Sequence, residues 1–448
     1  MKKILAMLLA LVMVFALCAC GQTAAPAAET PAAEAPAAEA PAAEAAGSVY
    51  YLNFKPEADE AWQALAATYT QQTGVPVKVV TAASGKYEET LTAELDKSEA
   101  PTLFQCNLSG IPTWGEFCYD MKDSAVYNEL SSADYALSTE DGVVCSVGYC
   151  LESFGIITNT ALLEQAGYSL ADITDFASLK AVADDIHARA AELGFDAFAP
   201  AGLDSSSSWR FTGHLTNMPL YYEFRDDNVV VQPATIKGTY IPNYKDIWDL
   251  YITDSSVTGA DLLTTTMEQC VGQFKEGKAV FYQNGTWELG GLKDAGMDLE
   301  KLVMIPMYCG VEGEENSGVC TGTENFWSVN NEADEEDIQA TLDFLYWVVT
   351  STEGTTMMRD AFGPCPFKSS LPSDNIFSQQ ANDYVAAGKY PVTWAFNFTP
   401  DTEEWRAPVL DALGKYTSAP GDATWADVVT AMVEGWSVQY QEQLAAQA

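Results

Sequence analysis

The chain has 448 residues, of which 63 are acidic and only 22 are basic, so its formal net charge is −41. A surface this negative repels nucleic acid and anionic lipid headgroups, which argues against both as partners. The acidic residues are scattered along the sequence, and we interpret them as groups that keep the protein soluble rather than as a cation-binding site.

The N-terminus has the layout of a secretory signal. Two lysines precede an almost unbroken apolar run over residues 4–15, which is short beside the roughly 20 residues that a spanning helix needs. The run leads to Leu17, which stands three residues before Cys20 with small residues between them. This spacing resembles the lipobox of bacterial lipoproteins, which implies that residues 1–19 are removed and that the Cys20 thiol carries a lipid such as palmitate. An ordinary signal with no lipid is the alternative.

Residues 20–48 predict a stalk between that anchor and the rest of the chain. They are rich in Ala, Pro and Glu, and a Pro-Ala-Ala-Glu repeat begins at Pro31, Pro36 and Pro41. Such a segment cannot bury a core, and its recurring prolines prevent a continuous helix. We expect an extended, self-repelling spacer that holds the body away from the outer face of the cytoplasmic membrane.

The elements of the body begin with a strand, a helix and a strand. Residues 49–54 form a short aromatic and aliphatic run that predicts a buried strand. Apolar residues at helical spacing follow and end at Gly74, and residues 75–80 predict a second strand. This order predicts a parallel βαβ unit. A helix over residues 87–97 and a strand over residues 101–105 continue the pattern.

A second set of elements follows. Residues 143–159 are rich in strand-forming residues, residues 179–193 have helical apolar spacing, and residues 195–198 predict another strand. Clear helices are predicted over residues 338–349 and 425–440. The predicted fold class is therefore α/β throughout, and the length of the body favours two lobes.

The cysteines after Cys20 leave their pairing open. There are eight: Cys106, Cys118, Cys145, Cys150, Cys270, Cys309, Cys320 and Cys365. None stands in a CxxC pair, and only two histidines are present, so no structural zinc site is expected. An exported chain can oxidise its thiols, but the spacing shows no dense disulfide framework, and an organism living without oxygen needs no bridges.

Four segments together resemble a known family. They are residues 51–57, 100–105, 155–159 and 277–287. In their order and spacing they resemble the sugar-binding, maltose-binding-protein-like substrate-binding proteins of bacterial ABC importers, the extracellular solute-binding family 1. The resemblance implies a periplasmic-binding-protein type II fold, in which two α/β sandwich lobes close over a ligand in the cleft between them.

The resemblance also implies lobe boundaries and partners. The N-terminal lobe is expected over residues 49–156 and 326–370, and the C-terminal lobe over residues 157–325 and 371–448. We expect a monomer with a carbohydrate ligand and the transmembrane subunits of an ABC permease as partners. No cofactor, metal, nucleic acid or membrane contact beyond the lipid is expected.

Aromatic residues beside polar partners are the best candidates for a sugar site, because sugar rings present apolar faces and a rim of hydroxyl groups. We expect ligand contacts from Phe54, Lys55, Tyr87, Gln105, Asn107, Glu152, Trp209, Arg210, Asn284, Trp287, Glu324, Asn325, Trp394, Asn397 and Trp405. Phe54 and Lys55 end a strand, which is where open α/β sheets bind ligands. Trp209, Trp287 and Glu324 carry the strongest expectation, and a place in the core is the alternative for each candidate.

The sequence thus predicts a lipid-anchored receptor that captures a mono- or oligosaccharide and delivers it to a permease without covalent chemistry. One alternative is the same fold with a polyamine or peptide ligand. A less favoured alternative is an exported glycosidase, which needs only two correctly spaced carboxylates. No nucleophile elbow or other hydrolase motif is present, and His187 and His214 are the only histidines. We expect His214 to be a structural hydrogen-bonding residue.

Overall fold

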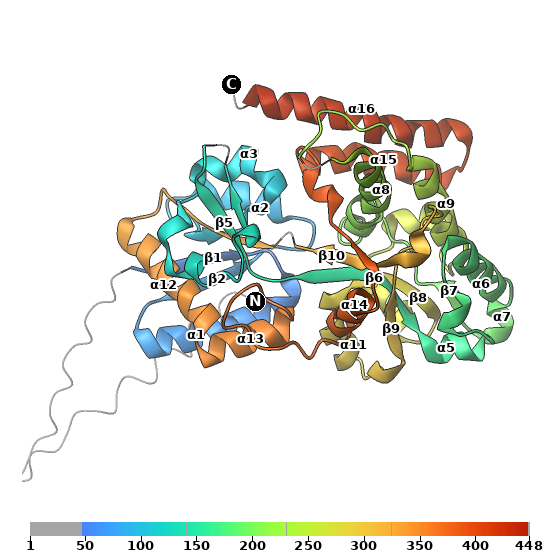
Figure 1. The fold of residues 1–448 in the computed structure, drawn as a ribbon, viewed down its shortest axis with the longest axis horizontal. Coiled ribbons are helices and arrows are strands. Elements are labelled where there is room, and N and C mark those ends of the chain that lie inside the picture. Colours follow the sequence, from blue (N-terminus) through green and yellow to red (C-terminus); the bar gives the residue numbers. More distant parts are fainter. Residues whose placement is uncertain (1–46, 140, 230, 324, 447–448) are drawn as a thin grey trace, which may run out of the picture. The chain divides into compact units, whose positions relative to one another are not determined.

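The computed structural model describes residues 47–139, 141–229, 231–323 and 325–446. The predicted signal peptide, the stalk and Cys20 lie outside the described residues, as does Glu324. The elements of the described residues, drawn in Figure 1, belong to one compact unit.

Twelve strands of the described residues form two sheets. The first sheet has the order β2-β1-β3-β11-β5-β4, from β1 (Val49–Asn53), β2 (Val77–Thr81), β3 (Leu103–Phe104), β4 (Ala136–Ser138), β5 (Val144–Gly148) and β11 (Phe326–Val329). The second has the order β12-β10-β6-β8-β7 with β9 also paired to β6, from β6 (Glu152–Asn159), β7 (Asp196–Phe198), β8 (Ala279–Gly285), β9 (Leu302–Ile305), β10 (Ser317–Gly322) and β12 (Tyr390–Val392).

Helices surround both sheets. The helices that precede β11 in the sequence are α1 (Asp59–Thr73), α2 (Tyr87–Leu95), α3 (Ile111–Trp114), α4 (Ala125–Asn128), α5 (Thr160–Gln165), α6 (Phe176–Ala188), α7 (Ala190–Leu193), α8 (Asn217–Asp227), α9 (Ile241–Thr253), α10 (Met267–Lys275) and α11 (Leu289–Asp294). After it come α12 (Glu335–Thr350), α13 (Thr352–Phe362), α14 (Ile376–Ala386), α15 (Thr402–Ser418) and α16 (Asp422–Ala446). The predicted α/β fold class is confirmed.

The predicted βαβ unit is present in the first sheet. β1 and β2 are parallel, with Val49 opposite Val77, and α1 connects them. The helix ends where the sequence indicates, because Gly74 adopts φ +81°, a left-handed conformation that other residues rarely take.

Each sheet is buried on both faces. Successive residues of a strand point to opposite faces, and Tyr51 and Leu52 of β1 accordingly enter two different hydrophobic clusters. Ile156 and Ile157 of β6 do the same in the second sheet. Trp62 is fully buried. Separate cores for the two sheets agree with a body of two lobes.

The chain crosses between the sheets three times, and two of these crossings are neighbours; the third lies between α13 and α14, on the way from β11 to β12. It passes from β5 to β6 through residues 149–151, and it returns from β10 to β11 through residues 323–325. β6 and β10 pair antiparallel, with Glu152 opposite Gly322, and run side by side at the junction (Figure 1). The two crossing segments therefore lie together.

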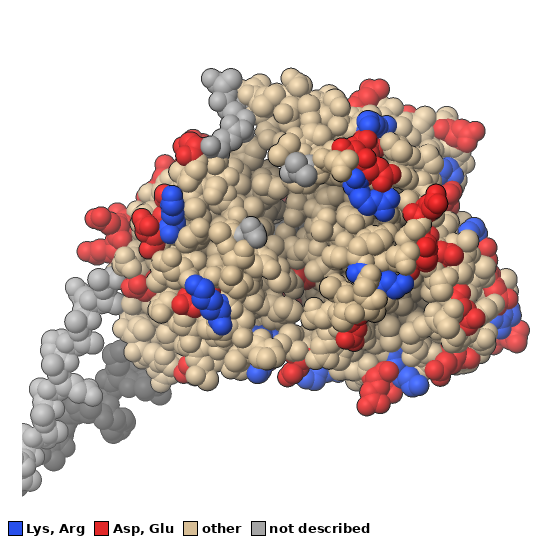
Figure 2. All heavy atoms as spheres, viewed as in Figure 1, with Lys and Arg blue, Asp and Glu red and all other residues tan. Residues whose placement is uncertain are grey.

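The distribution of charge on the surface and the lengths of the described helices agree with what the composition predicts. Figure 2 shows acidic side chains spread over the visible face rather than gathered in a single patch. Within the described ranges, no helix combines the length and apolar character needed to cross a bilayer.

Candidate functional site

An ion pair links the first sheet to the crossing segments. Lys55 stands two residues after the end of β1, and its Nζ lies 2.7 Å from Oε1 of Glu152, at the start of β6. The Nδ2 of Asn325, in the returning segment, donates to the other oxygen of Glu152 at 2.5 Å. The same Nζ is 5.5 Å from the ring centroid of Trp287 in the second sheet's set of elements. Four predicted residues therefore meet at the junction.

The electrostatics of this ion pair follow from its burial. The side chains of Lys55 and Glu152 are only 7% and 5% exposed. Burial by itself lowers the pKa of Lys55, but the charges of Glu152 and Glu57 outweigh that effect and raise the pKa above its usual value. Lys55 is thus a permanent cation held among carboxylates, and the Glu152 carboxylate is neutralised by it.

Two half-buried tryptophans stand next to Lys55. The rings of Trp209 and Trp287 lie 6.0 Å apart between centroids. Trp287 belongs to the turn Thr286–Glu288 after β8, and a Cβ on Gly285 would lie 2.3 Å from its ring. Glycine at this position is therefore what lets Trp287 fold back over the end of β8. The pair offers an aromatic surface next to Lys55, and ligand contact by these two residues stays a prediction.

His214 joins the tryptophans to further aromatic rings. Its ring stacks on Phe154 at 4.0 Å and lies 5.0 Å from Trp209 and 6.1 Å from Trp394. Burial lowers its pKa well below the usual value, with help from the charges of neighbouring basic residues, so the ring is neutral. The expected structural hydrogen bond is not made by Nδ1, which is buried without a partner among the described residues.

The junction has two sides, which we call walls: one belongs to the first sheet and its connections, and the other to the second sheet and its connections. The wall of the first sheet contains four more of the predicted residues. The ring of Phe54 packs edge-on against Tyr87 at 5.3 Å. The hydroxyl of Tyr87 accepts from the backbone N–H of Gln105 at 2.7 Å. Asn107 caps the short helix Leu108–Gly110, with its Oδ1 accepting from the N–H of Gly110 at 3.0 Å. These contacts hold the wall in place. The side-chain oxygen of Gln105 has no hydrogen-bond partner among the described residues.

The two walls contact each other beyond the crossing segments. The short helix Leu108–Gly110 packs against residues Ala395–Phe398. On another side, the Ser84 hydroxyl lies 3.5 Å from the carbonyl oxygen of Ser206. The two sides of the junction therefore touch at these two further points.

Glu88 is a site residue that sequence reasoning missed. It lies in α2 beside Trp114, whose Nε1 donates to its Oε2 at 2.7 Å. Burial raises its pKa from 4.5 to about 7, and the nearby carboxylates of Glu403 and Asp401, at the start of α15, contribute to the increase. The carboxyl group of Glu88 therefore faces the negative charges of Asp401 and Glu403 on the other wall. One acid among 63 gives no sequence signal for this role.

Replacing Glu88 with glutamine should stabilise the protein in a pH-dependent way. Below pH 4.5 the carboxyl group is protonated in both the folded and the unfolded chain, and between 4.5 and about 7 the folded chain holds the proton more tightly. Wild-type stability relative to Glu88→Gln should therefore fall as the pH rises through that range. Thermal unfolding across it measures the difference, and Glu89→Gln, at an exposed neighbour, is the control. An equal difference at all pH values would contradict the assignment.

Arg406 was also missed. It follows Trp405 in α15, and its Nη1 lies 3.1 Å from Glu403. A Cβ on Gly213 would lie 2.0 Å from its Nη2, so the guanidinium rests against the π-helical turn Arg210–Leu215 beside His214. Its Nε is buried without a hydrogen bond within the described part of the chain.

Three predicted residues are placed in the interior rather than at this junction. The guanidinium of Arg210 donates to the carbonyls of Gln283 and Pro200 and is fully buried. Asn284 bonds to Tyr282 and Glu288 from the end of β8. Trp405 packs edge-on against Trp436 and donates to Met432. Their polar groups all have partners inside the protein, apart from the Arg210 Nε.

Trp394 and Asn397 line a separate pocket of about 620 Å³ beside the crossing segments. Leu151 and Thr323 also line it, one residue before Glu152 and two residues before Asn325, but Lys55 itself and Trp287 do not. The pocket and the Lys55 cluster are joined through Trp394, whose ring contacts Phe154 at 5.4 Å. The structure therefore divides the predicted site residues between two neighbouring regions.

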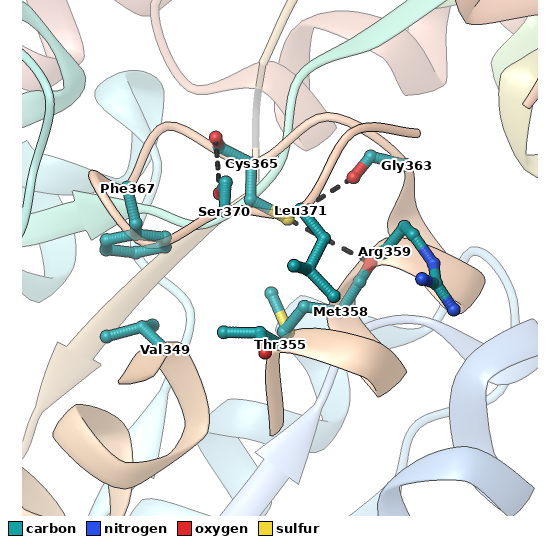
Figure 3. Close-up of a pocket in the computed structure, with 9 residues that line it drawn as sticks. All are labelled: Val349, Thr355, Met358, Arg359, Gly363, Cys365, Phe367, Ser370 and Leu371. Atoms are coloured by element: carbon teal, nitrogen blue, oxygen red, sulfur yellow. Dashed lines mark hydrogen bonds between the residues drawn. The ribbon is translucent and has the colours of Figure 1, made fainter. Parts of the chain in front are cut away.

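A second cavity near the crossing is too small for a solute. It is lined by Met358, Cys365 and Leu371 among others (Figure 3). Its volume is about 10 Å³, which is at the lower limit for one water molecule. We exclude it from the candidate site.

Some of the unpaired buried polar atoms of the described residues lie at or near the junction. Buried polar groups are nearly always hydrogen-bonded, because an unpaired group costs about 1–3 kcal/mol. Gln105 Oε1, Asn325 Oδ1, His214 Nδ1 and Trp394 Nε1 are buried and have no partner among the residues described. Asn325 belongs to the junction, His214 lies 5.3 Å from Trp287, and Trp394 lies 6.1 Å from His214, so a bound solute with hydroxyl groups could satisfy the unpaired atoms of these three residues. No group of three potential metal ligands occurs in the described ranges.

Comparison with known proteins identifies the fold and the family. Solved structures similar to this chain include RafE of Streptococcus pneumoniae in complex with raffinose, with TM-score 0.68, 14% identity and coverage of 87% of this chain and 99% of that one. A solute-binding protein of Thermotoga lettingae bound with α-D-tagatose has TM-score 0.67, 13% identity and coverage of 88% and 99%. A sugar transporter protein of Bacillus licheniformis in complex with stachyose has TM-score 0.62, 15% identity and coverage of 88% and 98%.

At these identities the structures establish the fold, which is the two-lobed fold expected from the sequence. No curated protein sequence matches the chain. The model of the family "Bacterial extracellular solute-binding protein" matches residues 64–388. The resemblance noted in the sequence is therefore confirmed, and the chain belongs to the bacterial extracellular solute-binding protein family.

Proposed function

We propose that this protein captures a neutral carbohydrate between its lobes outside the cell and presents it to an ABC permease. The observation that carries the proposal is the combination of Trp209 and Trp287 with the unpaired amide oxygens of Gln105 and Asn325. Tryptophan faces suit the apolar faces of sugar rings, and amide oxygens accept from sugar hydroxyl groups. Raffinose, tagatose and stachyose in complexes of the same fold support a sugar as the ligand class.

The charge of the junction favours a neutral ligand. Lys55 already neutralises Glu152, and Asn325 satisfies the remaining oxygen of that carboxylate. An anionic sugar would lie near the negative charges of Glu57 and Glu88. Lys55 is already paired with carboxylates, so the remaining basic residue nearby is Arg406 on the other wall. Like-charge contacts in a buried site are costly.

The mechanism is binding and closure without covalent chemistry. A ligand between the walls adds contacts to both, and it therefore shifts the equilibrium toward the closed arrangement by its differential affinity. We place the tether at Cys20, on the basis of its spacing from Leu17, and the stalk over residues 20–48 as the spacer. A tether keeps the receptor near a permease, which is useful to a receptor that delivers its ligand.

A polyamine is the second candidate ligand, and one observation favours it. Glu88 lies among the carboxylates of Asp401 and Glu403, and an added cation would relieve their mutual repulsion. Such a ligand would hold Glu88 in its ionised form. The neutral amides and tryptophans at the junction favour the sugar over this alternative.

Tryptophan fluorescence of the full chain titrated with a panel of neutral mono- and oligosaccharides tests the proposal. We expect a saturable change with at least one sugar in the micromolar range, because Trp209 and Trp287 would be covered by the ligand. Spermidine and a chromogenic glycoside are the two comparison arms. A response to spermidine alone, turnover of the glycoside, or no response to any sugar would contradict the proposal.

A further inference from the structure

A turn of the first wall and a loop of the second wall meet on one side of the junction. The turn spans residues 83–86, between β2 and α2, and the Lys86 N–H donates to the Ala83 carbonyl at 3.0 Å across it. The loop spans residues 204–208, between β7 and the π-helical turn Arg210–Leu215. All four residues of the turn are exposed, so the contact between the two segments lies at the surface.

The contact requires a glycine in the turn. Gly85 adopts φ +70°, the left-handed conformation that some turns need at their third residue and that glycine takes most readily. A Cβ at this position would lie 2.5 Å from the carbonyl oxygen of Ser205, which is closer than real Cβ atoms approach. The hydroxyl of the neighbouring Ser84 lies 3.5 Å from the carbonyl oxygen of Ser206. Any larger residue at position 85 would therefore push the two segments apart.

The same loop positions one of the two tryptophans at the junction. The Nε1 of Trp209 donates to the Ser206 carbonyl oxygen at 2.9 Å, so the oxygen that Ser84 approaches also orients the indole. The carboxylate of Asp204 accepts from the Ser206 N–H at 2.9 Å and holds the loop in place. On the other side, the turn leads directly into α2, whose first residue is Tyr87 of the first wall. The contact thus connects a candidate sugar-binding ring to the opposite wall.

We propose that residues 83–86 and 204–208 form a latch that closes beside a sugar held at the junction, and that Gly85 is the positioning residue that allows it to close. Sugar capture at the junction, as proposed above, supplies the ligand that the latch retains. The latch touches the loop that carries Trp209, so it slows the departure of the sugar although Gly85 does not contact the ligand. Affinity differences between related complexes lie mostly in the dissociation rate, which is where this effect belongs.

Cross-linking tests whether the latch forms, and it needs no sugar. Ala83→Cys and Ser205→Cys place two thiols at exposed positions of the two segments, and a short bismaleimide joins them in the full chain. The native cysteines of the described residues are free, and all except the half-buried Cys365 are buried, so the new thiols react first. Peptide mapping then measures the yield of the link. No link between positions 83 and 205 would overturn the proposal.

Gly85→Ala in the same background should lower the yield of this link. We expect a decrease of about tenfold, because steric overlap in a close contact shifts the balance between closed and open by that order. Gly85→Asn introduces the same overlap in a residue that tolerates a positive φ, and it replaces the alanine variant if that variant does not fold. Equal yields with and without these substitutions would overturn the role of Gly85.

Gly142→Ala is the matched control. Gly142 also has a positive φ, +90°, but nothing lies within 4 Å of the place that its Cβ would take. Alanine there introduces comparable backbone strain without an overlap, so the yield of the link should equal that of the parent. A decrease as large as that of Gly85→Ala would show that backbone strain, rather than the overlap with Ser205, separates the segments, and it would overturn the assignment.

Stopped-flow fluorescence tests the effect of the latch on the sugar. With the neutral sugar that responds in the titration above, Gly85→Ala should raise the dissociation rate constant about tenfold and leave the association rate constant nearly unchanged, whereas Gly142→Ala should change neither. An unchanged dissociation rate together with a reduced cross-link would overturn retention by the latch. If no sugar of the panel responds, the proposed function fails, and the cross-link between positions 83 and 205 separates that failure from failure of the latch to form.

Discussion

Trp287→Ala should weaken sugar binding by about 30-fold or more. Truncating a central aromatic contact typically costs about 2 kcal/mol or more, and 1.4 kcal/mol corresponds to a factor of ten. The ring of Trp287 lies 5.5 Å from the Lys55 ammonium group, and it is only half-buried, so a ligand can reach it. Calorimetric titration of wild type and variant with the sugar found by fluorescence measures the loss.

Trp347→Ala is the matched control for this prediction. Trp347 is also a half-buried tryptophan, but it packs on Tyr69 in the first sheet's helices, at 5.1 Å between ring centroids. This variant should lower the Tm and leave the sugar affinity unchanged. Equal affinity of Trp287→Ala and wild type, with both proteins folded, would show that the ligand does not use the junction.

Glu152→Ala should reduce the free energy of unfolding by about 3–5 kcal/mol, because it leaves a buried charge without its partner. Lys55 is 7% exposed, and Glu57, its other carboxylate, is 39% exposed and 3.2 Å away. The Nδ2 of Asn325 loses its acceptor in the same variant. Urea unfolding followed by circular dichroism measures the change.

A double variant separates the ion pair from general packing. Lys55→Met with Glu152→Ala removes both charges, so it should be less destabilising than the sum of the single changes. Glu57→Ala is the control, and at an exposed partner it should cost no more than about 1 kcal/mol. Additive effects in the double variant would mean that the two charges do not depend on each other.

The sequence predicted the elements that depend on local pattern. The first strand, helix and strand were found because their apolar spacing and Gly74 act within a few residues of each other. The α/β class follows from the repetition of such units. The placement of the anchor, the lobe boundaries and the ligand contacts remain predictions.

The candidate site depends on contacts between distant residues, which no local pattern encodes. Lys55 and Glu152 are 97 positions apart, and Asn325 is 173 positions from Glu152. Sequence reasoning chose all three as candidate ligand contacts, but their mutual contact required the crossing of the chain. Glu88 and Arg406 were missed because they sit on ordinary helices and acquire their role only when α2 and α15 face each other.

Other candidates show what composition cannot decide. Trp209 and Arg210 are adjacent, yet one is half-buried beside Trp287 and the other is turned inward to backbone carbonyls. The π-helical turn that begins at Arg210 sets this difference. Trp405 likewise has a polar sequence neighbourhood, but its helix turns the indole toward α16.

The crystal structure of the protein grown with the sugar found by fluorescence is the most direct test of carbohydrate capture at the junction. We expect electron density for a sugar ring against Trp287, with hydroxyl groups within hydrogen-bonding distance of Gln105 and Asn325. Density for the sugar only in the pocket lined by Trp394 and Asn397, or only on the outer surface, would contradict this assignment.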